Sequence, residues 1–460
     1  MVVCDSIILR VKGPLELKCQ LDSTKVPHIQ SMINKTFEGL CSKVKSDSLV
    51  LNVCNSPVFI WPNKDVFAKS ENITANTSCM DLLHFQMDQE STSKKSGKKK
   101  GKKNSIINMN LMTEVTEPVL SSAPVLHRST KHHFIHTILP MDCVVTVPID
   151  ETLKVACGRL MGALSSQLCD MQTVTLQHMK ETVLLVPQAF HFLLPEPTGL
   201  VTVIYPAGVP DSQLDVVRKE LHHRFELPDD KPYLKRANAF HFPDEPYKDG
   251  YLRTPHVNLN HPTLENGKLY LVQGVYCYHH YMQDHMDDNG WGCAYRSLQT
   301  ICSWFLYQGY VERAVPTHKE IQQALVAVGD KQDNFVDSRQ WIGSIEVQAV
   351  LNQLLGVTSK IMFVSQGSEL ASKGRELANH FLEEGTPVMI GGGVLAHTIL
   401  GVSWSETSGH IRFLILDPHY TGAEDLQVIT DKGWCGWKGP EFWDQNAYYN
   451  LCLPLRPKTI

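Results

Sequence analysis

The sequence predicts an α+β fold in two parts: an α/β N-terminal region over residues 1–265 and a separate α+β domain over residues 266–460. Three observations support this division. The chain has 460 residues, more than one hydrophobic core usually serves. A stretch rich in Pro, Asp, Asn and His spans residues 226–268 and reads as a connector. Seven of the eight tryptophans follow it, in a part where helical patterns precede several strand patterns.

The composition excludes several classes of protein. The formal net charge is −5 and apolar residues make up 43% of the chain, so we expect no general attraction to nucleic acid and no insertion into a membrane. No apolar run approaches the roughly 20 residues that span a bilayer. The first six residues lack the basic and apolar segments of a signal peptide. Any membrane association is therefore expected to run through a partner.

Cysteine usage indicates a reducing compartment. The thirteen cysteines are scattered and none forms a C-x-x-C pair, which argues for free thiols and against a structural zinc site. We expect no metal and no cofactor.

The N-terminal region reads as a scaffold or recognition domain, because nothing before residue 230 has the spacing of a catalytic site. Strands are predicted over 6–11, 49–53, 57–61, 183–186 and 200–205, and a helix over 153–168. Residues 86–131 lose periodicity and include a run with seven lysines over 94–103. Such a run repels itself, so we expect disorder. A nuclear signal or a site for an acidic partner is the alternative.

Cys293 is the candidate nucleophile of the second part. It follows the glycine-rich loop Asn289-Gly290-Trp291-Gly292 and precedes apolar residues at helical spacing from Leu298 to Phe305. A thiol at the start of a helix meets unpaired backbone N–H groups that stabilise a thiolate. The other twelve cysteines are interpreted as structural.

The candidate base is His419, which lies two residues beyond Asp417 after the apolar run Ile411–Leu416. If the pleat of that strand continues, Asp417 and His419 share a face, and the carboxylate can orient the imidazole. His397 is a rival, because the strand Ala396–Trp404 precedes this one and a hairpin would bring His397 opposite Asp417. Spacing leaves both histidines open, as the base or as a buried structural residue.

Two further features lie upstream of Cys293. Tyr281 could donate its phenol O–H to an oxyanion, and a place in the core or groove is the alternative. The neighbouring histidines and carboxylates could be taken for a metal site, but their spacing favours an acidic, solvated loop. These residues are His279, His280, Asp284, His285, Asp287 and Asp288.

The segment Asp288–Gln299, together with Asp417-Pro418-His419, resembles two related families of papain-like cysteine peptidase. One is the autophagins, which share a Gly-Trp-Gly-Cys loop and an Asp-Pro-His box. The other is the ubiquitin-fold modifier specific proteases, and residues 268–460 look closest to its long form, which also has an extra N-terminal domain.

The resemblance implies Cys293 as nucleophile, His419 as general base and acid, Asp417 as orienting residue and Tyr281 as oxyanion donor. It implies hydrolysis after the C-terminal glycine of the modifier, in the precursor and in conjugates on lysine. Trp291 and Gly292 would then form a narrow substrate groove, which only a thin glycine tail can enter. The alternatives are an autophagin-type peptidase acting on a lipid-conjugated modifier and an inactive scaffold that binds the modifier.

The long form of the family is associated with the surface of the endoplasmic reticulum. The resemblance therefore implies a cytoplasmic protein at the cytosolic face of that membrane, held by an adaptor through the N-terminal region.

Overall fold

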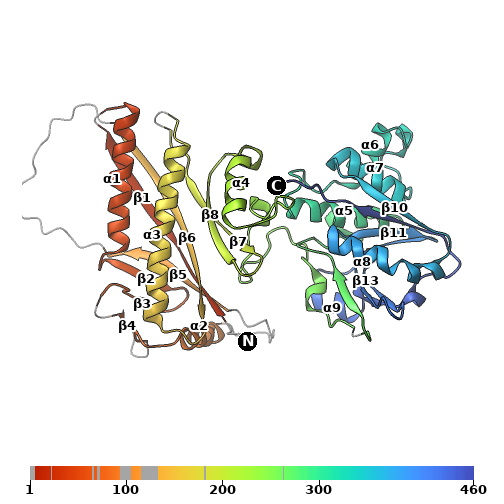
Figure 1. The fold of residues 1–460 in the computed structure, drawn as a ribbon, viewed down its shortest axis with the longest axis horizontal. Helices are drawn as coiled ribbons and strands as arrows, with labels where there is room; N and C mark the ends of the chain where they lie inside the picture. The colour runs from red at the N-terminus through yellow and green to blue at the C-terminus, as the bar shows by residue number, and fades with distance from the viewer. Residues whose placement is uncertain are drawn as a thin grey trace, which may run out of the picture. The chain divides into compact units, whose positions relative to one another are not determined.

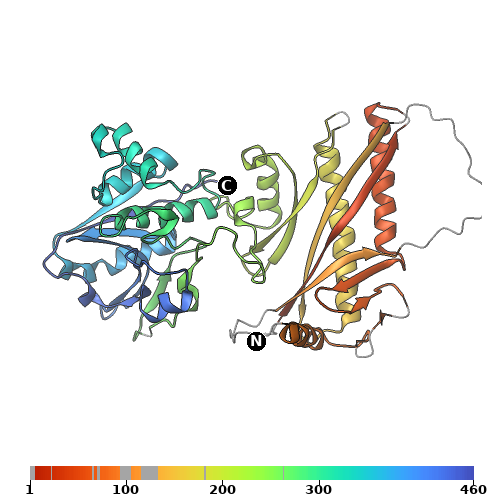
Figure 2. The ribbon, with the colours of Figure 1, turned by 180° about the vertical axis from the view of Figure 1, so that it is seen from behind.

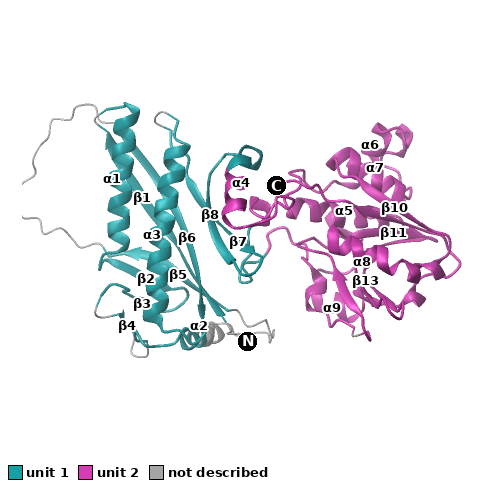
Figure 3. Cartoon of the chain, in the orientation of Figure 1, with its two compact units in different colours: residues 1–216, 239–246 teal, residues 217–238, 247–460 magenta. Residues whose placement is uncertain are grey.

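The computed structural model divides into two compact units, which are coloured separately in Figure 3. It describes residues 6–460 with short gaps at 22, 65–66, 70–72, 94–104, 115–132, 181–182 and 263. Unit 1 comprises residues 1–216 and 239–246, and unit 2 comprises residues 217–238 and 247–460. The division therefore differs from the predicted boundary at 265, because part of the connector belongs to the second unit.

Unit 1 is built on a six-stranded sheet. The strand order is β4-β3-β2-β5-β1-β6, and β1 pairs with β6 along its whole length. The bounds are β1 Ser6–Leu21, β2 Leu49–Val53, β3 Phe59–Ile60, β4 Ala68–Lys69, β5 Ile106–Thr113 and β6 His133–Pro148. A separate two-stranded sheet joins β7 (Pro187–Leu194) to β8 (Gly199–Pro206).

Two long helices, α1 (Val26–Val44) and α3 (Leu153–Gln177), lie side by side along the sheet of unit 1 (Figures 1 and 2). The apolar stripe of α1 recurs at helical spacing and is buried, from Ile29 through Ile33 and Phe37 to Val44. The apolar residues of α3 are also buried at helical spacing, as the sequence pattern over residues 153–168 predicts. Helix α2 spans Cys79–Ser93. Helix α4 spans Asp215–Arg224, and the division between the units falls within it, after Val216.

The expectation of disorder over residues 86–131 fails where the structure describes this stretch. Helix α2 continues to Ser93, and β5 pairs with both β1 and β2. In β5, Ile107, Met109 and Leu111 alternate into the core, a period-2 pattern that the sequence analysis overlooked. The lysine-rich run itself lies outside the described residues. The strand predicted over 183–186 is also wrong, since β7 begins only at Pro187.

Unit 2 contains a second sheet with the order β10-β15-β11-β12-β13-β14, and β9 also pairs with β12. Its strands are β9 Lys268–Leu271, β10 Ser359–Val364, β11 Val388–Gly392, β12 Leu395–Trp404, β13 Ile411–Leu416, β14 Cys435–Lys438 and β15 Tyr449–Pro454. The predicted hairpin is confirmed, because β12 and β13 pair antiparallel.

Helix α5 (Cys293–Tyr307) is the central helix of unit 2 and contacts β11 and β12. It is buried on every side from Ala294 to Phe305, so its first residue is fixed in place relative to the sheet. The remaining helices are α6 His318–Ala327, α7 Ser344–Leu355, α8 Gly374–Glu383 and α9 Leu426–Asp431. Among the described residues, the search for a helix with the length and apolar character to cross a bilayer finds none.

Candidate active site

The loop before α5 is shaped by a single buried residue, Asp288. Its backbone oxygen accepts hydrogen bonds from the N–H groups of Trp291 at 3.1 Å and Gly292 at 2.9 Å. Gly290 has φ +82°, a conformation that favours glycine. A Cβ at position 292 would lie 2.6 Å from the Cβ of Asp288. Both glycines are therefore required for the turn that delivers Cys293 to the start of α5.

The side chain of Asp288 joins this loop to two helices. Its carboxylate accepts hydrogen bonds from Arg296 Nε at 2.6 Å and the Met282 backbone N–H at 2.8 Å, and lies 3.0 Å from His318 Nε2. Arg296 also pairs with Asp284 at 2.9 Å. Burial would raise the pKa of Asp288, but His318 and Arg296 outweigh it and lower that pKa. The expected solvated acidic loop is therefore wrong for Asp288, which is buried because it is fully paired.

His419 and Asp417 meet as predicted, but through a turn. Strand β13 ends at Leu416, so the pleat does not continue to these residues. Instead, one carboxylate oxygen of Asp417 accepts the backbone N–H of His419 at 2.9 Å and contacts its Nδ1 at 2.6 Å. This double contact fixes the orientation of the ring and places the proton on Nδ1. The other nitrogen, Nε2, is buried and has no hydrogen-bond partner among the described residues.

Cys293 and His419 shift each other's pKa in opposite directions. Burial opposes charge on both groups, yet interaction with His419 lowers the pKa of Cys293. Asp417 and Cys293 raise the pKa of His419 to about 9 against the same burial. The pair therefore favours a thiolate beside an imidazolium. By contrast, burial raises the pKa of Cys435 and Cys452 to about 12, as the structural interpretation of those thiols predicts.

Tyr281 completes the cluster. Its backbone N–H donates to the carbonyl of Pro418 at 2.9 Å, and its ring stands edge-on to His419 with centroids 5.3 Å apart. Burial and the nearby Cys293 raise the pKa of the phenol, so the O–H keeps its proton at neutral pH. The adjacent His280 contacts the backbone oxygen of Tyr281 and Glu424 Oε1, at 3.0 and 2.8 Å.

His397 lies on the far side of Asp417. Its Nε2 is 3.8 Å from the second carboxylate oxygen of Asp417, and its ring is 5.2 Å from that of His419. Burial lowers the pKa of His397 to about 4, and Cys293 is not among the groups that influence it. The structure thus couples the thiol to His419 and leaves His397 as a neutral neighbour of the carboxylate.

By distance alone, His397, Asp417 and His419 could hold a metal ion, since their ligand atoms lie within 4.8 Å of one another. In this protein the close contact between His419 Nδ1 and Asp417 occupies one atom of each. Among the described residues, the His279–Asp288 cluster forms no comparable group.

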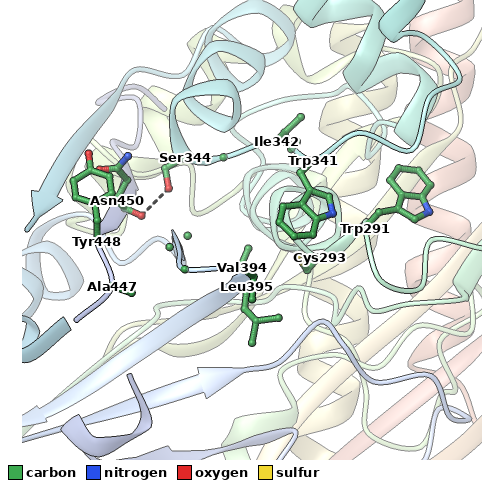
Figure 4. A pocket seen from close by; sticks show the side chains of 15 residues that line it. Trp291, Cys293, Trp341, Ile342, Ser344, Val394, Leu395, Ala447, Tyr448 and Asn450 are labelled. Atoms are coloured by element: carbon green, nitrogen blue, oxygen red, sulfur yellow. Dashed lines mark hydrogen bonds between the residues drawn. The ribbon is translucent and has the colours of Figure 1, made fainter. Parts of the chain in front are cut away.

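A cavity of about 480 Å³ opens beside Cys293 (Figure 4). Trp291 lines it as predicted, whereas Gly292 lies against Asp288. Trp341, which is 56% exposed, lines the same cavity and was missed by the sequence analysis. Opposite Cys293, Ser344 Oγ donates to the backbone oxygen of Asn450 at 2.7 Å. The glycine run 391–393 lines the cavity, and its lack of side chains leaves room for an extended chain to lie against the backbone.

The chain matches two known protein families. Residues 34–247 match the family described as Ubiquitin-fold modifier 1 specific protease 2, N-terminal, and residues 267–452 match Peptidase family C78. Proteins named Ufm1-specific protease 2 are similar over essentially the whole chain. The one from Gallus gallus is 59% identical over 99% of this chain and 100% of its own length. The one from Homo sapiens is 56% identical over 100% of both.

A solved structure shows the same fold. The crystal structure of UfSP from C. elegans aligns with a TM-score of 0.73 and 31% identity, over 98% of this chain and 78% of that one.

Proposed function

The chain belongs to the Ufm1-specific protease 2 family of cysteine peptidases, and we propose that Cys293, His419, Asp417 and Tyr281 form its active site. It hydrolyses the bond after the C-terminal glycine of Ufm1, in the precursor and in conjugates on lysine side chains. The observation that supports the assignment of residues most directly is the opposite shift of two pKa values, lowered for Cys293 and raised to about 9 for His419. The similarity to proteins named Ufm1-specific protease 2 over the whole chain favours this function over the autophagin alternative.

The first half of the reaction forms an acyl-enzyme. The Cys293 thiolate attacks the glycine carbonyl carbon, and the carbonyl oxygen takes up negative charge near the phenol of Tyr281, which donates a hydrogen bond. The C–N bond breaks as His419 Nε2 gives its proton to the leaving amine. The product of this half is a thioester between Cys293 and the modifier, together with a free amine.

The second half consumes water. His419, now neutral, takes a proton from a water molecule that attacks the thioester carbonyl. The C–S bond breaks, the modifier leaves with a free carboxyl group, and the thiolate–imidazolium pair is restored. Asp417 holds the tautomer and orientation of His419 through both halves, because its contact is with Nδ1 rather than Nε2.

A Ufm1 probe with a C-terminal electrophile tests the proposal. It should label the wild-type chain at Cys293 and leave Cys293→Ala unlabelled, as located by mass spectrometry of the peptide. An unlabelled wild-type chain would favour the inactive scaffold. Incubation with the Ufm1 precursor and with an autophagy-modifier precursor tests selectivity, and cleavage of the second alone would contradict the assignment.

We also propose that the N-terminal unit binds an adaptor at the cytosolic face of the endoplasmic reticulum. Two large apolar side chains of edge strand β6 support this, because Phe134 is 71% exposed and Ile138 is 52% exposed. Full-length protein with Phe134→Asp and Ile138→Asp should lose membrane association in cell fractionation while keeping its activity on the Ufm1 precursor. Unchanged fractionation would contradict this role of the surface.

A further inference from the structure

Two cavities lie on either side of the turn that joins β11 to β12. The turn, Gly392–Leu395, lines both of them. The cavity described above contains Cys293 on its wall. The second cavity, of about 590 Å³, contains His419 instead, together with His397, Asp417, Phe442, Trp443, Asp444 and Tyr449. Cys293 thus lines one cavity and His419 lines the other.

The chemistry of the reaction indicates which part of the substrate each cavity would hold. His419 protonates the leaving nitrogen, so the leaving group has to lie on the side of His419. The acyl part is attached to Cys293 and occupies the side of that residue. This assignment of sides rests on the proposed function, in which His419 is the acid.

We propose that the second cavity is the leaving-group site, and that it binds the aliphatic stem and amine of the lysine from which the modifier is released. Its wall is aromatic and rigid. Trp443 is only 3% exposed and packs edge-on against Phe442 at 4.9 Å and Tyr449 at 5.6 Å. Aromatic faces suit both parts of a lysine side chain, because they cover its methylene groups and attract its ammonium.

The charges in this cavity also suit a cationic product. Two carboxylates line it, the exposed Asp444 and the half-buried Asp417. The neutral His397 adds no positive charge that would repel an ammonium. Nζ of Lys438 lies 5.7 Å from the centroid of Phe442, within the range of a cation–π contact.

Two substrates that share the acyl part but differ in the leaving group can distinguish the roles of the two cavities. One is Ufm1 joined by an isopeptide bond to a lysine in a short peptide, and the other is the methyl ester of Ufm1, which has no stem. In Phe442→Ala, kcat/KM for the isopeptide should fall about 10-fold more than kcat/KM for the ester. Phe363→Ala is the matched control, because Phe363 is 60% exposed on β10 and lines neither cavity.

Equal losses on the two substrates, or no loss on the isopeptide, would overturn the leaving-group site. A wild-type chain that hydrolyses neither substrate would overturn the proposed function with it, and that outcome is distinct from equal losses in the variant.

A second measurement needs no variant. Isopeptides built on lysine, ornithine and diaminobutyrate shorten the stem by one methylene each, and kcat/KM should fall about threefold for each methylene removed. A flat series would overturn the proposal, because it would show that the stem is not bound.

Discussion

Each unit contains a half-buried carboxylate between a histidine and a second nitrogen-bearing side chain, and the two sites differ in which group lies beside the histidine. In unit 1, the carboxylate of Asp142 accepts two hydrogen bonds from Arg10, of 2.9 and 2.7 Å, and lies 3.3 Å from His191 Nε2. Arg10 is also bound to Glu245 at 2.8 Å and stacks on Phe242.

In unit 2, Asp417 holds only one nitrogen of His419, and the other has no hydrogen-bond partner among the described residues. That free nitrogen belongs to the ring whose pKa is coupled to Cys293. His191 Nε2 has no hydrogen-bond partner among the described residues either. A His–Asp contact is therefore structural where a buried arginine holds the carboxylate, and it becomes chemical where a thiol whose pKa the histidine lowers lies beside the ring.

The largest expected effect follows from removing the thiolate. Cys293→Ser should lower kcat/KM for the Ufm1 precursor by at least ~10⁴-fold, because the hydroxyl stays protonated where the thiol ionises. Binding of Ufm1 should persist, measured by titration calorimetry. Substantial turnover by this variant would contradict the assignment of Cys293 as the nucleophile.

The second-largest effect is expected at the two histidines on either side of Asp417, whose replacement should lower kcat to different extents. His419→Ala should reduce kcat about 10³-fold or more, whereas His397→Ala should reduce it less than about 10-fold. Single-turnover cleavage of the precursor measures both. The opposite ranking would make His397 the base and would contradict the coupling of His419 to Cys293.

Tyr281→Phe should cost about 10²-fold in kcat with little change in KM, because the phenol O–H meets charge that develops only in the transition state. An effect confined to KM would show that Tyr281 binds substrate without stabilising the oxyanion.

The pH profile tests the pairing of the two charges. The active form needs the Cys293 thiolate and the His419 imidazolium, so kcat/KM should fall above about pH 9 as His419 loses its proton. Asp417 raises the pKa of His419, so Asp417→Asn should move this alkaline limb to lower pH. A limb that stays at the same pH in that variant would contradict the role of Asp417.

The smallest effect on activity is expected in unit 1. Asp142→Asn should leave kcat unchanged but should lower the free energy of unfolding by about 2 kcal/mol, because the buried guanidinium of Arg10 loses its charged partner Asp142 and keeps only Glu245. Urea denaturation of the full chain measures this change. Because pairing with Arg10 and His191 lowers the pKa of Asp142 to about 2, against burial, its contribution to stability is lost as pH falls from about 4 to about 2. A loss of activity without a loss of stability would contradict the purely structural role of Asp142.

The local parts of the site could be predicted from the sequence. Glycines before Cys293 and apolar periodicity after it are sufficient to place a thiol at a helix start. Two apolar runs joined by the short segment 405–410 are sufficient for the β12–β13 hairpin. The contact of Asp417 with His419 was predicted for the wrong reason, since it forms through a turn beyond β13.

The long-range parts could not be predicted in this way. The burial of Asp288 depends on His318, thirty residues further along the chain, and no pattern near Asp288 indicates that pairing. Trp341 reaches the cavity of Cys293 from another loop, and its Nε1 donates to the backbone oxygen of Gly290 at 3.3 Å. Such contacts are set by the packing of whole elements rather than by local spacing.

The turn Gly392–Leu395 has a consequence for inhibitor chemistry. An electrophile that reacts with Cys293 and fills only the adjacent cavity imitates the glycine tail of the modifier, a feature that other peptidases of glycine-ended modifiers also accept. Selectivity for this protein then has to come from a second arm, which passes the turn and ends against the aromatic wall of Phe442 and Trp443. Val394, 67% exposed at the tip of the turn, is the side chain around which the linker of such a two-armed compound would be shaped.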